Sequence, residues 1–479
     1  MRKASKSQWI KFGIVALIYI LFIAWVGNFW WLLLLPFIFD IYISKIISWG
    51  KWKQSKNQNV RKITEWVDAI VFALIAVYFI NTFIFQNYKI PSSSLEKTLL
   101  VGDFLFVSKV SYGPRVPNTP LSFPLAQHTL PVLNTKSYIE WPQWPYRRLK
   151  GLGEVQRYDI VVFNFPAGDT VALNYQQTDF YSLSRQVEDE LHVTNGSQVI
   201  RNNPKDFGRV VFRPVDRREN YVKRCVGMPG DSLQIKDNQV YIDGKELVNP
   251  QKMQLNYFVE TTGSRWSDKT FSLFGISKED SSQGTVSPQN VQLFQMLGIA
   301  PAGKDQTGQD YYNPVYRIPL TQEALAKLKK SGYARSITIE SDAFGGGPVY
   351  PVNYDMGWTR DNYGPIWIPK KGATIDLTEK NIALYQRCIV NYEHNQMEVE
   401  NGQILINGQP ASTYTFKYDY YFMLGDNRHK SADSRYWGFV PEDHVVGKPI
   451  LIWLSLDKDH GLFNGGIRWN RLFRFVGND

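Results

Sequence analysis

The sequence predicts a mainly β domain outside the cytoplasm, with N-terminal transmembrane helices and a large α/β insertion. Three observations lead to this fold class: apolar segments within the first 87 residues, short runs of β-branched and aromatic residues between turn signals after residue 88, and a polar, glycine-rich and serine-rich stretch from about 250 to 387. The chain has 479 residues, more than the roughly 250–300 at which a single core stops growing. We therefore expect more than one structural unit.

The N-terminal region contains three apolar segments, at residues 12–26, 29–47 and 69–85, and the second is interrupted by Asp40 and Lys45. A helix that spans a bilayer needs about 20 residues. The third segment is a good candidate for such a helix, whereas the first two form either a tight helical hairpin or one long tilted helix. Residues 1–87 are thus predicted to be a membrane anchor with two or three transmembrane helices.

Basic residues indicate on which side of the membrane each segment ends. They crowd the loop at about 49–65, which we expect to be cytoplasmic because cytoplasmic loops carry an excess of lysine and arginine. The third apolar segment then carries the chain outward, so residues from about 88 to 479 lie outside the cytoplasm with either number of spans. Basic residues near the N-terminus favour a cytoplasmic start and hence three spans. The residues concerned are Arg2, Lys3, Lys6, Lys11, Lys51, Lys53, Lys56, Arg61 and Lys62.

Charge and composition exclude several classes of function. The net charge is +10, but much of the excess lies beside the apolar segments, where it indicates membrane topology, so no nucleic-acid partner is predicted. Cys225 and Cys388 have no C-x-x-C spacing, and two buried thiols are favoured over one disulfide between them. The six histidines show no H-E-x-x-H pattern, so no metal site is expected. Any hydrolytic chemistry here should therefore be metal-free.

Residues 88–249 together with 388–479 are predicted to form a β-rich core. Runs such as DFLFVSKV, DIVVFNF and GKPILIWLSL are typical of strands, and the pairs Asp243-Gly244 and Asn407-Gly408 mark hairpins. The range 250–387 is predicted to be an inserted accessory region with one helix at 321–330, TQEALAKLKK, which starts at a capping threonine and closes on Ser331-Gly332.

Ser94 is a candidate nucleophile, because it lies just beyond the last apolar segment, where a hydroxyl could meet a membrane-tethered polypeptide. A serine attacks an amide only if a base takes its proton, and no histidine here has the context of a triad base. Lys97 completes an S-x-x-K motif with Ser94, which is the signature of penicillin-binding proteins and β-lactamases. That class is the less favoured alternative, since no S-x-N follows and Lys330-Ser331-Gly332 closes a helix instead of lying on a strand.

Lys223, in ENYVKRCVGMPGDSL, is the other candidate base. Its apolar neighbours indicate a buried strand, and burial can lower the pKa of a lysine until the neutral amine is available near working pH. A lysine whose amine reaches solvent at a strand edge is the structural alternative. A third stretch, GDNRHKSADSRYWGFVP at 425–441, holds many small polar residues and suits a buried hydrogen-bonded network that braces a site.

Taken together, these stretches resemble the motifs of the bacterial type I signal peptidases, which are membrane-bound serine proteases with a Ser-Lys dyad. PSSSLEKTLLVGD resembles the family's nucleophile box, RYDIVVF its R-G-D-I-V-V-F box, YVKRCVGMPGD its lysine box and the stretch from Gly425 its final box. Tyr158 stands where the second box has glycine. The resemblance implies a signal-peptidase-like β fold for the catalytic domain.

The resemblance also implies a role for each matching residue. Ser94 would be the nucleophile and Lys223 the general base, while the Ser92 hydroxyl and the Ser94 backbone N–H would form the oxyanion hole. Ser431 would orient the lysine, and Asp433 and Arg435 would form an ion pair that braces it. The residues that would line shallow pockets for small side chains are Tyr88, Ile90, Leu99, Tyr221 and Val222.

The implied function is removal of N-terminal signal peptides from exported precursor proteins by a multi-pass protein of the bacterial cytoplasmic (inner) membrane, with its catalytic domain on the extracytoplasmic or periplasmic face. Its partners would be signal-peptide-bearing precursors and the lipid bilayer, and it would need no cofactor. A specialised processing peptidase fits the same sequence. A membrane-anchored binding or scaffold protein that lost catalysis is the alternative from another class, and the intact Ser94, Lys223, Ser431 and Asp433 argue against it.

Overall fold

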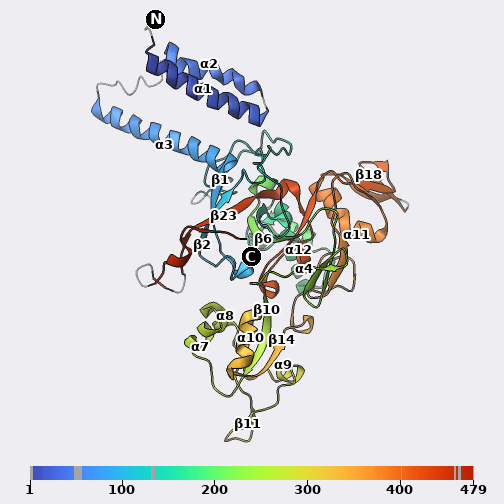
Figure 1. Ribbon diagram of the computed structural model, residues 1–479. Coiled ribbons are helices and arrows are strands. Elements are labelled where there is room, and N and C mark those ends of the chain that lie inside the picture. The colour runs from blue at the N-terminus through green and yellow to red at the C-terminus, as the bar shows by residue number, and fades with distance from the viewer. Residues whose placement is uncertain are drawn as a thin grey trace. The chain divides into compact units, whose positions relative to one another are not determined.

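The computed structural model describes residues 4–27, 29–47, 57–130, 133, 135–400, 402–457, 460–461 and 465–477 (Figure 1). The chain divides into two compact units, Met1–Gln86 with Lys109–Glu154, and Asn87–Ser108 with Val155–Asp479. The second unit is mainly β, as the sequence predicts, and contains the whole range 250–387. The finer division into anchor, core and insertion stays a prediction.

Two helices of the first unit are long and apolar enough to cross a membrane by length and composition, α1 (Lys6–Val26) and α3 (Gln58–Phe83). A capping box starts α1, in which the Ser5 side chain accepts a hydrogen bond from the backbone N–H of Gln8. Gly27 ends α1 in the left-handed region at φ 65°, as a glycine does readily. Local sequence therefore sets both ends of the first helix.

The apolar segment between these helices contains a shorter apolar helix, Trp31–Ser44, whose helix type changes along its length. It consists of η1 (Phe29–Leu34), α2 (Leu35–Phe39) and η2 (Asp40–Ser44), a π-helical turn. The Asp40 carboxylate accepts hydrogen bonds from the backbone N–H groups of Ile46, at 2.7 Å, and Ile47, at 3.1 Å. The helical part of the segment therefore ends before these two residues, at Ser44. The number of spans and their orientation stay predictions. Of the basic residues behind them, Arg2, Lys3, Lys51, Lys53 and Lys56 lie outside the described residues.

The main sheet of the second unit carries the predicted motifs on or beside its strands. Its order is β1-β2-β23-β3-β6-β21-β22, with β24 beside β23, and the pairs from β2 to β22 are antiparallel. The side chains of β2 alternate between buried and half-buried, whereas β3 is buried along its whole length. The bounds are β1 Phe85–Lys89, β2 Asp103–Ser108, β3 Ile160–Asn164, β6 Asn220–Gly227, β21 Tyr420–Leu424, β22 Val440–Pro441, β23 Val445–Ser455 and β24 Arg474–Phe475.

Both predicted hairpins are confirmed. In a second sheet, ordered β15-β7-β8-β9, strand β8 (Gln239–Ile242) turns through Asp243-Gly244 into β9 (Lys245–Glu246). Asn407-Gly408 likewise joins β18 (Gln403–Ile406) to β19 (Gln409–Pro410). All four turn residues have positive φ, between 50° and 76°, which explains the asparagine, aspartate and glycine at these positions.

The range 250–387 builds a small lobe of its own over its first ninety residues. A three-stranded sheet, β13-β10-β14 (Val315–Thr321, Gln254–Thr261 and Ala334–Ile339), packs against α10 (Gln322–Ser331). The Thr321 side chain caps α10 and Gly332 ends it, as predicted. Three short helices that the sequence did not reveal also belong here, α7 (Asp268–Leu273), α8 (Lys278–Gln283) and α9 (Val291–Met296).

The end of the same range packs with the core instead of with the lobe. Strand β15 (Tyr363–Trp367) pairs with β7 (Ser232–Lys236), and α11 (Glu379–Arg387) runs into η8 (Cys388–Tyr392), a π-helical turn. Their apolar residues join one cluster with those of β7, β8 and β21. Cys388 and Cys225 are both buried free thiols, as expected.

A helical excursion interrupts the core between β3 and β6. It starts and ends at the antiparallel pair β4 (Thr170–Ala172) and β5 (Val210–Phe212) and contains α4 (Phe180–Leu191), α5 (Gly196–Asn202) and α6 (Pro204–Phe207). Its own small core unites Phe180, Leu183, Val187 and Ile200 with Ala172. The sequence predicted only β structure here, so these helices are an addition to the expected fold.

The remaining elements are short helical turns and short strands. They are η4 Ser93–Leu95, η5 Pro166–Asp169, η6 Val215–Arg217, β11 Gly303–Lys304, β12 Asp310–Tyr311, η7 Asp342–Phe344, β16 Thr374–Asp376, β17 Met397–Glu400, β20 Thr413–Thr415, η9 Arg428–Lys430, α12 Ser434–Trp437, η10 Glu442–His444 and η11 Trp469–Arg471.

Candidate active site

The turn that carries Ser94 is held in place by apolar packing. After β1 the backbone N–H of Ile90 donates to the Asp103 carbonyl at 2.9 Å, and the chain then turns at Pro91 into η4. Leu95 is almost fully buried, in a cluster with Ile90 and Leu99. Ser94 itself is 6% exposed, so its hydroxyl is withdrawn from bulk solvent.

The structure brings Ser94 and Lys223 together. Lys223 lies on β6, between β3 and β21, and only 4% of it is exposed. Its Nζ donates a hydrogen bond to the Ser94 Oγ over 2.6 Å. Two residues far apart in sequence, and predicted to act as a pair, are thus in direct contact.

Burial gives this lysine an unusual acidity. Desolvation lowers the pKa of Lys223 from its ordinary value to about 8, although the nearby carboxylates of Asp433 and Asp426 act in the opposite direction. A large share of the amine is therefore neutral at mildly alkaline pH. A neutral amine in contact with a serine hydroxyl can accept its proton.

Lys97, the lysine of the S-x-x-K motif, is directed elsewhere. Its Nζ donates a hydrogen bond to the carbonyl of Gly275, in the turn between α7 and α8. Its backbone takes a left-handed φ of 73°. The amine that contacts Ser94 is that of Lys223.

The loop from Gly425 to Arg435 fits tightly around the Ser94 turn. The backbone N–H of Asn427 donates to the Ser94 carbonyl at 3.0 Å, and the Asn427 side chain donates to the Ser93 carbonyl at 3.2 Å. A Cβ on Gly425 would lie 2.2 Å from the Ser431 Oγ and 2.7 Å from the Ser94 carbonyl oxygen. Only glycine leaves room for this close approach.

Two buried ion pairs brace this loop from either side. Arg435 binds both carboxylate oxygens of Asp433 at 2.8 Å, and Arg224 binds both carboxylate oxygens of Asp426 at 2.8 Å. All four side chains are at most 1% exposed. Thr98, from the Ser94 turn, adds a hydrogen bond to Asp426 at 2.7 Å. Burial opposes ionisation of Asp433, but the Arg435 guanidinium outweighs it and keeps the pKa of that carboxyl below its usual value.

Two of the predicted serines, Ser431 and Ser92, lie near the Ser94 turn. Ser431 is 5% exposed, lies against Gly425, and its hydroxyl helps to lower the pKa of the Asp433 carboxyl by hydrogen bonding. Ser92 precedes η4 in an extended conformation, is exposed, and its side chain does not cap that helix. Ser92 is thus close to Ser94 in sequence, and Ser431 is close to it in space.

The predicted pocket residues fall into two groups, one packed on each face of β6. Ile90 and Leu99 are buried in one apolar cluster, against which Tyr88 and Val222 pack. Tyr221 lies on the other face, together with Lys223, because side chains alternate along a strand. The Tyr221 ring stacks on Phe165 with a centroid distance of 4.3 Å, and the Lys223 Nζ is 5.7 Å from its centroid.

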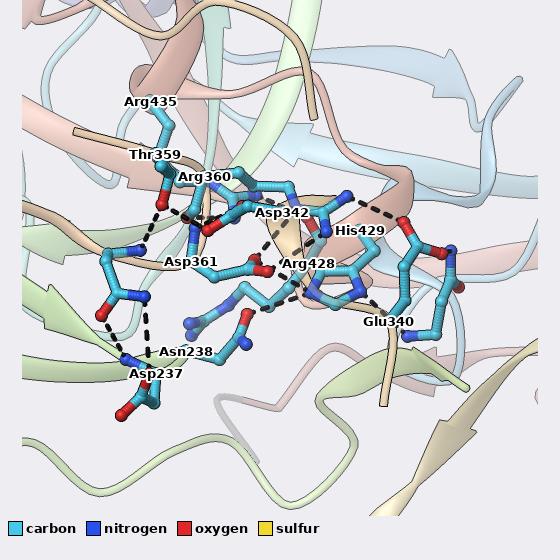
Figure 2. A network of polar contacts seen from close by, with 12 residues as sticks. Asp237, Asn238, Glu340, Asp342, Thr359, Arg360, Asp361, Arg428, His429 and Arg435 are labelled. Atoms are coloured by element: carbon cyan, nitrogen blue, oxygen red, sulfur yellow. Dashed lines mark hydrogen bonds and ion pairs between the residues drawn. The ribbon is translucent and has the colours of Figure 1, made fainter. Parts of the chain in front are cut away.

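A polar network ties the same loop to the lobe of 250–342, and sequence reasoning missed it (Figure 2). The His429 Nδ1 accepts the backbone N–H of Asn256 at 3.2 Å, so the ring proton lies on Nε2, which faces Asp361 at 3.1 Å and Asn238 at 3.0 Å. Arg360 holds Asp361 on one side and Glu340 on the other. The only signal in the sequence was the position of His429 within the final motif.

Further contacts join the lobe and the segment after it to the loop from Gly425 to Arg435. The Lys430 Nζ donates to Asp280 at 2.6 Å, the Gln254 backbone N–H donates to the Asp426 carbonyl at 2.9 Å, and Arg435 donates to the Arg360 carbonyl at 3.3 Å. The lobe and the segment that follows it therefore support the loop that surrounds Ser94.

Among the described residues, no group of three or more His, Cys, Asp and Glu side chains is arranged to hold a metal ion. The groups that hydrogen-bond to Ser94 include the Lys223 amine and the Asn427 backbone amide. Such a set suits proton transfer and charge stabilisation at a carbonyl.

Comparison with known proteins shows the family of this chain. The family described as "Signal peptidase, peptidase S26" matches residues 63–291 and 372–454, which is more than half of the chain. A signal peptidase I of Buchnera aphidicola subsp. Acyrthosiphon pisum is 24% identical over 89% of this chain and 88% of its own length. Signal peptidase I of Helicobacter pylori strain J99 is 22% identical over 86% and 91%, and that of Pseudomonas aeruginosa is 24% identical over 80% and 69%.

The mainly β domain and the apolar N-terminal helices are those of a membrane-anchored hydrolase of the protease class. The chain belongs to the signal peptidase family, peptidase S26. Residues 292–371, which lie between the two matched segments, cover part of the lobe and the network around Asp361.

Replacing Asp426 by Asn is expected to destabilise the second unit strongly. Asp426→Asn would leave the buried Arg224 guanidinium without a counter-charge, and breaking such a pair costs about 3–5 kcal/mol. The measurement is urea unfolding in detergent followed by tryptophan fluorescence. Glu246→Gln, on exposed β9, is the matched control and should change the free energy of unfolding by less than about 0.5 kcal/mol. Equal stability of the two variants would contradict the role given to this ion pair.

Proposed function

We propose that this protein removes N-terminal signal peptides from exported precursor proteins, with Ser94 as nucleophile and Lys223 as general base. The observation that carries the proposal is the contact of 2.6 Å between the Lys223 Nζ and the Ser94 Oγ, in a buried site where the pKa of the lysine is lowered to about 8. Membership of the signal peptidase family supports the substrate class.

The chemistry follows from the positions of these groups. The Ser94 Oγ attacks the carbonyl carbon of the residue before the cut while the neutral Lys223 amine takes the hydroxyl proton. The resulting ammonium then gives that proton to the amine of the leaving polypeptide as the C–N bond breaks, which leaves an ester on Ser94. A water molecule, deprotonated by the same amine, hydrolyses the ester and releases the signal peptide.

The neighbouring hydroxyls and carboxylates fit supporting roles. The exposed Ser92 hydroxyl and the Ser94 backbone N–H would donate to the oxyanion that forms during each attack. The buried Ser431 hydroxyl, which donates to Asp433, would accept from the Lys223 ammonium and orient it. The pair of Asp433 and Arg435 would hold the Ser431 segment in place.

The apolar cluster beside Ser94 supports selectivity for small side chains. Ile90, Leu99 and Val222, with Tyr88 packed against them, present bulky groups that would leave shallow pockets for residues such as alanine before the cut. The apolar helices α1 and α3 would anchor the protein in the bacterial cytoplasmic membrane, with the basic segment that contains Arg61 and Lys62 on the cytoplasmic side. The catalytic domain would then face outward, where precursors emerge.

Two other functions fit this site less well. A catalytically inactive scaffold has no need to keep a lysine buried against a serine hydroxyl, since burial of that amine opposes stability. An acyl enzyme of the S-x-x-K type needs Lys97 at Ser94, whereas the Lys97 Nζ binds the Gly275 carbonyl. The dyad of Ser94 and Lys223 is therefore the arrangement that we propose.

Variants of the two lysines and of the serine test the dyad. Ser94→Ala and Lys223→Ala should each lower kcat on a purified precursor with an A-x-A site by at least about a thousandfold, because both act as one unit. Lys97→Ala should retain nearly the wild-type rate. Cleavage is followed in detergent by gel electrophoresis and mass spectrometry of the products. Loss of activity in Lys97→Ala with activity kept in Lys223→Ala would transfer the assignment to the S-x-x-K class.

The pH profile tests the protonation state of Lys223. The reactive form is the neutral amine, so kcat/KM should rise by about tenfold per pH unit below about pH 7 and level off above the lysine pKa of about 8. The measurement uses a peptide substrate without ionisable groups near the cut, between about pH 6 and pH 9. A profile that is flat across this range, or that falls as the pH rises, would rule out a lysine base with this pKa.

Asp361 is expected to position the catalytic loop through His429 and Arg360. Asp361→Asn should lower kcat by about tenfold with KM changed by less than about twofold, and should move the acidic limb of the pH profile to lower pH. The shift is expected because Asp433 and Asp426, which raise the pKa of Lys223, lie on the loop that would loosen.

A merely structural loss would scale the rate equally at every pH. Asp361→Glu should restore part of the rate, and Asp237→Asn, at the exposed rim of the same network, is the matched control. An unchanged acidic limb in Asp361→Asn would show that Asp361 does not act on the dyad.

A further inference from the structure

A groove of about 740 Å³ opens beside the catalytic strand. Its walls come from α4 and the residues before it, from the segment 346–353, from α11 with η8, and from residues 432–437. Two of these walls belong to segments whose helices the sequence did not predict. The volume lies within the range of about 300–1,000 Å³ that is typical of ligand sites, which is room for a short peptide segment.

One side of the groove lies close to the dyad. Tyr221 lines the groove, and the Lys223 Nζ is 5.7 Å from the centroid of its ring. Ala432, which is exposed and follows Ser431 directly, also lines the groove. The groove is therefore separated from the amine that would transfer the proton only by the Tyr221 side chain.

The proton transfer determines which part of a substrate would enter this groove, and this step rests on the proposed function. Lys223 must come within about 2.6–3.2 Å of the leaving amine to protonate it. The residues that follow the cut are bonded to that amine, so they start beside Lys223 and Tyr221. The apolar cluster with Val222, proposed for the residues before the cut, lies on the opposite face of β6.

The lining of the groove suits an extended polypeptide. Its inner wall is aromatic, with Phe165 stacked on Tyr221 and Trp437 at 5.1 Å from Phe165, and such rings contact side chains of many kinds. Exposed amide side chains, Gln186 on α4 and Gln386 on α11, can pair with peptide groups.

The charges of the lining residues sum to zero. Asp179 and Asp189 carry negative charge, and Arg185 and Arg387 carry positive charge. The Arg387 guanidinium already contacts the Asp169 carboxylate at 3.7 Å and the Tyr181 ring at 4.1 Å. A groove without a dominant charge favours the neutral backbone of a polypeptide over a strongly charged ligand. We propose that this groove binds the first residues of the mature polypeptide, immediately after the cut, in an extended conformation.

The test compares two substrates that share a signal sequence and an A-x-A site. One ends a single residue after the cut and the other about eight residues after it, a length that would fill the groove. For the wild type, kcat/KM should be about tenfold higher for the long substrate, because extra contacts of this kind are typically worth that much. Ala383→Trp, on α11 inside the groove, should reduce the ratio of long-substrate to short-substrate kcat/KM to about one.

Two further variants keep the result interpretable. Lys380→Trp, exposed on the same helix and outside the groove, should leave the wild-type ratio. The double variant Gln186→Ala with Gln386→Ala removes only exposed side chains, and it should also lower the ratio of long-substrate to short-substrate kcat/KM. It therefore tests the proposal even if Ala383→Trp disturbs folding.

The outcomes separate this proposal from the proposed function. Equal wild-type rates on both substrates, with Ser94→Ala inactive, would overturn the groove assignment alone. A wild-type ratio that persists in Ala383→Trp and in the glutamine double variant would do the same. If these variants instead abolish a preference for residues before the cut, the groove binds the signal-peptide side and the proposal is wrong. Activity in Ser94→Ala would overturn the proposed function itself.

Discussion

The burial of Lys223 against Ser94 is the constraint to which the rest of the site is fitted. An ammonium in this position loses its hydration, so the fold must either neutralise the charge or lower the pKa. Two carboxylates, Asp433 and Asp426, lie close enough to act on it, yet each is bound through both oxygens by its own arginine. Their charges are largely compensated by these arginines. Desolvation outweighs both carboxylates, so the pKa of the lysine is lowered to about 8.

The same two ion pairs explain why the loop from Gly425 to Arg435 must be rigid. Two parallel hydrogen bonds between a guanidinium and a carboxylate fix the relative orientation and the separation of the two side chains. Here both arginines are buried as well. Asn427 then transmits that rigidity to the Ser94 turn through its backbone and side-chain hydrogen bonds. The lobe adds a second layer of support through His429 and Lys430. A region that the sequence indicated only as an accessory thus contacts the loop that surrounds the dyad.

The sequence predicts those features that depend on residues close together in the chain. The strands around Ser94 and Lys223, the hairpins at Asp243 and Asn407 and the cap at Thr321 all depend on neighbouring residues, and they were predicted. The contact between Asp361 and His429 joins residues from separate segments, and no local pattern indicates it. The helices α7, α8 and α9 are only six residues long, too short for a clear periodicity, and tertiary packing stabilises them. The structure in turn explains one departure from the motif of the resembled family. Tyr158 has a φ of 73°, a backbone conformation that favours the glycine of that motif.

The placement of the helical excursion lets it form a wall beside the candidate site while the strands of that site keep their register. The excursion of α4 to α6 enters and leaves at the paired strands β4 and β5, whose ends lie next to each other. Long insertions at such points cost little, because the entropy of closing a loop grows only slowly with its length. The register of β3 with β6, Val161 opposite Lys223, is kept on the strands that flank the excursion. Geometry at Lys223 is therefore insulated from changes in the excursion, while the shape of the neighbouring groove depends on it directly.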